Sequence, residues 1–97
     1  AYVFYFIEAM QQAAQELGLT ADQGNALAIA TFVGAAHLAA ESSDPVALLR
    51  ERVTSKGGTT YAALNSLDAS GVKAAIVTAA KAAAVRGKEL SKEFGRD

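Results

Sequence analysis

The stretch Thr54-Ser55-Lys56-Gly57-Gly58-Thr59-Thr60 separates two segments whose apolar residues have helical spacing. Its adjacent glycines allow the backbone to approach a ligand closely. The two threonines that follow supply capping oxygens for a helix whose first N–H groups have no partner within it. A carboxylate or phosphate bound there would gain hydrogen bonds and the favourable end of the helix dipole. The stretch therefore has the composition of an anion site between two helices.

The same residues also fit a plain turn between helices, in which the glycines permit a reversal and the threonines cap a helix. The local pattern does not choose between the two interpretations. A phosphate loop of the GxxxxGK[ST] type is excluded, because Lys56 precedes the glycines and no strand leads into them. The sequence G-x-G-x-x-G is absent, so we do not expect this chain by itself to bind a dinucleotide.

The first half of the chain predicts two helices. Apolar spacing continues to Leu17 and stops at Gly18, a residue suited to a helix C-terminus. The capping box Thr20-Ala21-Asp22-Gln23 predicts a second helix over residues 21–42. Small residues crowd this second helix, so we expect it to pack closely within the domain or against a second subunit. Four of the seven aromatic residues lie within the first six positions, and we expect a surface outside this chain to cover them.

The second half predicts three more helices. Asp44-Pro45 reads as an N-cap followed by proline at the first helical position of a short helix that ends near Val53. A fourth helix begins at about Thr60 and stops at Gly71, and a long last helix covers residues 72–94. Five helices and no convincing strand make this an all-α domain.

Composition limits the function classes. The 97 residues are 52% hydrophobic and carry nine basic and ten acidic side chains, a balance that argues for one folded domain and against nucleic acid as a partner. There is no cysteine, and one histidine with scattered carboxylates does not make a metal site. We expect that histidine, His37, to be packed or in an interface. The longest apolar run, residues 26–40, is shorter than the roughly 20 residues of a membrane span, and no signal peptide is recognisable.

The wider context of the glycine pair resembles a known family. In order, the segment contains Pro45, Leu49, Val53-Thr54-Ser55, Gly57-Gly58, Thr60, Ala63-Leu64 and Leu67-Asp68. That order and spacing resemble the signature segment of pyrroline-5-carboxylate reductase. The remainder also looks like that family, so residues 1–97 are interpreted as its C-terminal helical dimerisation and substrate-binding domain. The family's N-terminal Rossmann-type domain is absent from this chain.

The resemblance implies an enzyme that reduces 1-pyrroline-5-carboxylate to L-proline in proline biosynthesis, with a hydride from NADPH or NADH. The absent domain would bind most of the cofactor, so this chain alone is expected to be inactive. The resemblance implies that the Ser55 hydroxyl and the main-chain N–H groups of Gly58 and Thr59 bind the substrate carboxylate, and that the catalytic residue Thr60 contacts the imine nitrogen. Lys56 departs from the family, in which many members carry proline there, so we expect a less rigid loop with added positive potential.

The resemblance also implies that two such domains interlock into a helical homodimer. Each active site would then join the loop of one subunit to the nucleotide domain of its partner, and dimers would assemble further, up to decamers, in the cytoplasm. The alternative from another class is a non-enzymatic helical dimerisation or partner-binding module, in which the Gly-Gly loop is only a turn.

Overall fold

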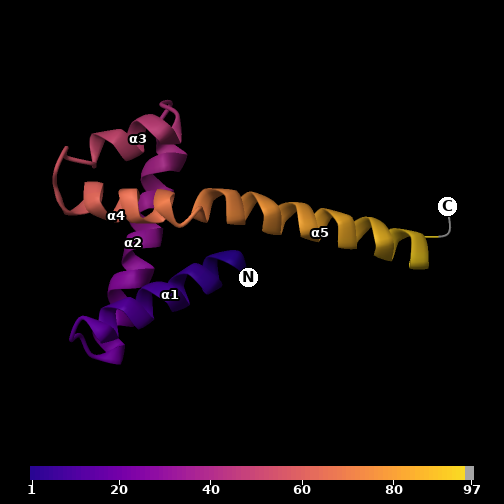
Figure 1. The fold of residues 1–97 in the computed structure, drawn as a ribbon, viewed down its shortest axis with the longest axis horizontal. Helices are drawn as coiled ribbons and strands as arrows, with labels where there is room; N and C mark the ends of the chain where they lie inside the picture. Colours follow the sequence, from indigo (N-terminus) through magenta and orange to yellow (C-terminus); the bar gives the residue numbers. More distant parts are fainter. Residues whose placement is uncertain (96–97) are drawn as a thin grey trace. The chain divides into compact units, whose positions relative to one another are not determined.

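The computed structural model describes residues 1–95, which form five α-helices and no strand (Figure 1). The helices are α1 (Tyr2–Glu16), α2 (Ala21–Glu41), α3 (Val46–Arg52), α4 (Thr59–Ala69) and α5 (Val72–Phe94). The chain divides into two compact units, Ala1–Arg50 and the residues from Glu51 onward. The all-α fold class with five helices is therefore confirmed. Within the described part, no helix is both long enough and apolar enough to cross a membrane.

The connection between α1 and α2 is fixed by backbone hydrogen bonds around a left-handed glycine. Gly18 has φ +103°, and its N–H donates to the Gln15 carbonyl oxygen at 3.0 Å. The Leu19 N–H reaches back to the Ala14 carbonyl oxygen, also at 3.0 Å. This pair of bonds is the Schellman motif, which satisfies carbonyl groups that the helix end leaves without partners. Gly18 thus ends α1 as predicted.

The start of α2 is fixed by the predicted capping box. The Gln23 N–H donates to Thr20 Oγ1 at 3.1 Å, while the Thr20 N–H donates to Gln23 Oε1 at 3.0 Å. Two N–H groups that the helix cannot satisfy are therefore paired by side chains three residues apart. With a helix stop and a helix start separated by so few residues, the turn between α1 and α2 is closely specified by local sequence.

The α1–α2 pair makes its closest approach at Gly24. A Cβ atom added to Gly24 would lie 3.1 Å from Ala14 Cβ and 3.5 Å from the Gln11 carbonyl oxygen, so only a hydrogen atom fits comfortably there. The Gln11 side chain also donates a hydrogen bond to Asn25 Oδ1 across the same contact. Gly24 and Ala28, one turn apart on α2, are the two buried residues among those described. Small side chains on α2 therefore let the two helices pack closely.

Most of the large apolar side chains are exposed in this chain. Ala28 is the buried apolar residue of residues 1–95, at 2% exposure, whereas Phe4 and Tyr5 are 73% and 72% exposed. The expected excess of aromatic surface at the start of α1 is therefore present. Apolar side chains of α2 and α5 are also exposed, by 42–65%, including Leu27, Ile29, Val33, Leu38, Ile76, Val77, Val85 and Phe94. Exposed apolar surface on this scale marks an interaction surface.

Two helix starts differ by one residue from the sequence prediction. Helix α3 begins at Val46, and the Pro45 carbonyl oxygen accepts from the Leu48 and Leu49 N–H groups at 3.0 and 3.2 Å. Pro45 thus precedes the helix and provides its first acceptor. Helix α4 begins at Thr59, because extended backbone at Gly58 (ψ −173°) gives way to helix directly after it. Gly71 lies between α4 and α5 with φ +67°, which ends the fourth helix as predicted.

We predict that Gly24→Val destabilises the α1–α2 pair by about 1–3 kcal/mol, because the new side chain would overlap Ala14 and the α1 backbone. Urea unfolding followed by circular dichroism measures this loss. Gly34→Ala is the control on the same helix: a Cβ there meets nothing within 4 Å, so the higher helix propensity of alanine should add up to about 1 kcal/mol. Equal losses in both variants would contradict the proposed contact.

Candidate functional site

The loop between α3 and α4 contains a tight turn over Ser55, Lys56, Gly57 and Gly58. The Gly58 N–H donates to the Ser55 carbonyl oxygen at 2.9 Å, which closes the turn. Gly57 occupies its third position with φ +77°. This left-handed backbone is the conformation that a type II turn requires at its third position, and it favours glycine. The first glycine of the pair is therefore explained by backbone conformation.

The second glycine is explained by space. A Cβ added to Gly58 would lie 3.2 Å from the Ser55 carbonyl oxygen and 3.5 Å from Ser55 Cβ. Any side chain at Gly58 would push against Ser55 and open the turn. The same distances show that the base of the Ser55 side chain lies beside the residue that precedes α4. The turn thus brings the serine to the N-terminus of the helix.

The first turn of α4 presents backbone donors. Gly58 is the N-cap residue and has no side chain to accept from the helix, and the Ala62 N–H makes the first helical bond, to the Gly58 carbonyl oxygen at 3.1 Å. The N–H groups of Thr59, Thr60 and Tyr61 precede that bond and therefore have no acceptor within the helix. The first turn carries no acidic side chain that would offset the positive end of the helix dipole. This arrangement is able to bind a small anion.

The structure brings the four predicted site residues into one loop and helix start. Ser55, Thr59 and Thr60 are exposed and Gly58 is half-buried. One detail differs from the expectation: the Gly58 N–H, predicted to face a carboxylate, donates to the Ser55 carbonyl oxygen instead. The cause is the left-handed turn at Gly57, which folds Gly58 back onto Ser55. The N–H of Thr59 begins the series of donors that this turn leaves available.

The titratable side chains of residues 1–95 outside this loop do not form a second chemical site. His37 is on α2 with its side chain 72% exposed, and its Nε2 lies 3.3 Å from Glu41 Oε1. The His37 side chain is therefore not packed within the described residues. Of the two places expected for it, an interface remains. Among residues 1–95, no three histidine, cysteine, aspartate or glutamate side chains lie close enough together to hold a metal ion.

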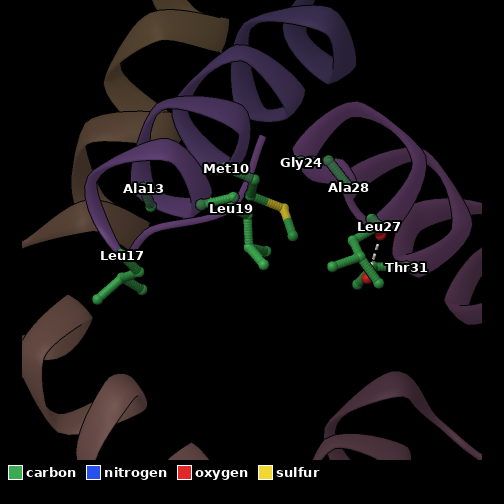
Figure 2. A pocket seen from close by; sticks show the side chains of 9 residues that line it. Met10, Ala13, Leu17, Leu19, Gly24, Leu27, Ala28 and Thr31 are labelled. Carbon is green, nitrogen blue, oxygen red and sulfur yellow. Dashed lines mark hydrogen bonds between the residues drawn. The ribbon is translucent and has the colours of Figure 1, made fainter. Parts of the chain in front are cut away.

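An apolar groove on the α1–α2 pair was not foreseen from the sequence. Figure 2 shows Met10 and Leu19 on one side of the hollow and Leu27 on the other. The Thr31 hydroxyl, also in the lining, donates to the Leu27 carbonyl oxygen at 2.7 Å, so its proton is turned to its own helix. The groove lies beside the close approach of α1 and α2, and Gly24 is part of its lining. Helical periodicity places these apolar residues on a helix face but does not specify how closely α1 and α2 pack.

Comparisons with known proteins identify what this loop and these helices resemble. The family model described as pyrroline-5-carboxylate reductase dimerisation matches residues 1–90. A pyrroline-5-carboxylate reductase of Pseudomonas aeruginosa is 41% identical over 96 residues, which are 99% of this chain and 35% of the relative. Pyrroline-5-carboxylate reductase 2 of Bacillus subtilis is 38% identical over 94 residues, 97% of this chain and 34% of the relative. The chain thus spans about a third of the length of these relatives.

Solved structures agree with the sequence comparisons. A Plasmodium falciparum pyrroline carboxylate reductase, whose structure has NADP bound, matches with a TM-score of 0.88 and 31% identity, over 91% of this chain and 35% of its own. A pyrroline-5-carboxylate reductase from Coxiella burnetii matches with a TM-score of 0.88 and 42% identity, over 92% of this chain and 33% of its own.

The turn geometry predicts that Gly57→Val destabilises the chain by about 1–2 kcal/mol, because a β-branched residue is strained at φ +77°. Gly57→Asn is the matched variant, since asparagine adopts the left-handed conformation more readily and should recover most of the loss. Urea unfolding of both variants measures the difference. If valine were tolerated as well as asparagine, the left-handed turn would not be required.

Proposed function

Because the chain belongs to the pyrroline-5-carboxylate reductase dimerisation family, we propose that it is the C-terminal, substrate-binding and dimerising part of a pyrroline-5-carboxylate reductase. The whole enzyme would reduce 1-pyrroline-5-carboxylate to L-proline in proline biosynthesis. The observation that carries this proposal is the agreement between the family match over residues 1–90 and the donor-rich start of α4. The reductases of Pseudomonas aeruginosa and Bacillus subtilis support it by similarity over nearly all of this chain.

The nicotinamide cofactor does not fit this chain alone. No strand and no G-x-G-x-x-G turn occur among the described residues, so the backbone cradle for a dinucleotide pyrophosphate is missing from them. We therefore assign NADPH or NADH mainly to a nucleotide-binding domain outside this chain, and expect this chain by itself to be inactive. When bound there, the cofactor supplies the hydride.

The proposed task of this chain is to hold the cyclic substrate by its carboxylate. The Thr59 N–H at the start of α4 and the Ser55 hydroxyl would donate to the carboxylate oxygens, and charge-assisted bonds of this kind are stronger than neutral ones. Gly58 would contribute by close approach of its backbone. Its N–H takes part only if it leaves or shares its bond with the Ser55 carbonyl oxygen.

Thr60 is proposed as the residue that contacts the imine nitrogen of the ring. It follows Thr59 in the first turn of α4, so a ring held by its carboxylate at Thr59 would lie within reach of the neighbouring hydroxyl. Two fixed points define the orientation of a small ring. Holding the reacting carbon in one orientation removes an entropic part of the barrier without needing a strong acid. Ser55, Gly58, Thr59 and Thr60 thus remain the proposed substrate-binding residues, with Thr60 as the catalytic one.

The proposal includes a homodimer whose active sites each combine this loop with the nucleotide domain of the other subunit. Supporting observations are the family description as a dimerisation domain and the exposed apolar side chains of α1, α2 and α5. Assembly of dimers to decamers and a cytoplasmic location belong to the same proposal and rest on the family resemblance.

One observation favours the second candidate, a helical dimerisation or partner-binding module without catalysis. The Gly58 N–H is already bonded within the turn, as it would be in a loop that serves only to connect helices. The donors of Thr59 and Thr60 are compatible with both candidates, because the first N–H groups of any helix lack a partner within it. Reductase activity of the full-length protein distinguishes the two.

The proposed role of Thr60 predicts that Thr60→Ala lowers kcat/KM of the full-length enzyme for 1-pyrroline-5-carboxylate by about tenfold or more. The lost hydrogen bond would be worth on the order of 1.5–3 kcal/mol in the transition state. Thr60→Ser keeps the hydroxyl and should retain most of the activity, and Thr78→Ala on α5 controls for the loss of an exposed threonine. Unchanged kinetics in Thr60→Ala would remove Thr60 from the site, and a full-length protein without reductase activity would favour the second candidate.

The exposed apolar surface predicts that the 97-residue chain is a dimer in solution. Light scattering across micromolar concentrations should give twice the mass of the chain, because a second copy covers side chains that its own helices leave exposed. A monomer mass together with a fully helical circular dichroism spectrum would contradict the proposed dimer.

A further inference from the structure

Lys56 is the charged residue of the loop between α3, which ends at Arg52, and α4. It is the charged residue of the segment from Val53 to Leu67, in which every other side chain is apolar or uncharged. It occupies the second position of the turn and is exposed. No hydrogen bond or ion pair of Lys56 occurs within residues 1–95. Arg86 on α5 shows the contrast, because its guanidinium contacts the carboxylates of Glu89 and Glu93 at 3.1 and 3.2 Å.

The turn keeps this charge near the proposed carboxylate position. Lys56 directly follows Ser55, and consecutive Cα atoms are about 3.8 Å apart. The hydrogen bond from the Gly58 N–H to the Ser55 carbonyl oxygen closes the turn around Lys56, so its backbone is fixed relative to the start of α4. A lysine side chain is long enough to stay in water while its ammonium remains within about 8 Å of an anion at Ser55. At that distance in water, attraction between two unit charges is worth about a twofold change in affinity.

We infer that Lys56 is a specificity residue that makes the site favour ring compounds carrying a negative charge over neutral rings of the same shape. This inference rests on the proposed function. Lys56 acts through its field and not through a fixed contact, so it strengthens binding of the ground state and leaves the chemical step unchanged. Exposed charges act over about a Debye length, so the effect is strong at low salt and disappears at high salt.

The test compares Lys56→Gln, Lys56→Arg and wild type in the full-length enzyme, with Lys81→Gln on α5 as the control for loss of one exposed lysine charge. The measurements are KM and kcat for 1-pyrroline-5-carboxylate, and inhibition by tetrahydro-2-furoate, an anion whose ring oxygen carries no charge, and by its neutral amide, tetrahydrofuran-2-carboxamide. Each is made at about 0.01 M and about 1 M salt, where the Debye lengths are about 30 Å and 3 Å.

At low salt, Lys56→Gln should raise KM and the inhibition constant of tetrahydro-2-furoate two- to threefold and leave kcat and the constant of the neutral amide unchanged. Lys56→Arg and Lys81→Gln should match wild type, and all differences should vanish at high salt. The inference is overturned if Lys56→Gln binds tetrahydro-2-furoate as wild type does, or weakens the anion and the neutral amide equally. Either result leaves the proposed function intact provided that Thr60→Ala still lowers kcat/KM, whereas a wild-type protein that reduces no cyclic imine overturns both.

Discussion

The structure depends on apolar surface that this chain does not bury. A domain of about this size covers only about two thirds of the surface of its unfolded chain even when it is compact. Here Ala28 is the buried apolar side chain among residues 1–95, and the aromatic start of α1 is largely exposed. Because hydrophobic burial is the main favourable term in folding, helices with so little of it depend on another surface for their stability. Because the chain belongs to a dimerisation family, a second subunit would provide that surface.

The two adjacent glycines perform different tasks. Gly57 permits the left-handed backbone, and Gly58 leaves room for the Ser55 carbonyl group. A substitution at either position would therefore disturb the turn for a different reason. Together they place a serine side chain beside a helix start that has unpaired donors and no acidic residue in its first turn. Loop conformation and electrostatics therefore favour the same class of ligand, a small anion.

Helix boundaries were predictable because they are set by neighbouring residues. Gly18 and the Thr20–Gln23 capping box fix the first turn through bonds that span only a few positions, and their residue types are specific to helix ends. The four candidate site residues lie in one loop and helix start, and their roles stay predictions. The hydrogen bond from the Gly58 N–H to the Ser55 carbonyl oxygen was not predicted, because the sequence Ser-x-Gly-Gly is compatible with both an open donor and a closed turn. The apolar groove depends on how closely α1 and α2 cross at Gly24, which helical periodicity does not determine.

The hydrogen bond that closes the turn at Ser55 also has a thermodynamic consequence. A flexible glycine pair would lose much backbone freedom when it ordered around a ligand, at about 1–2 kcal/mol for each residue. In this chain the loop is held by a hydrogen bond of its own, from the Gly58 N–H to the Ser55 carbonyl oxygen. Ordering of these residues is then part of folding, and less of the interaction energy with a bound molecule is spent on arranging the loop that receives it.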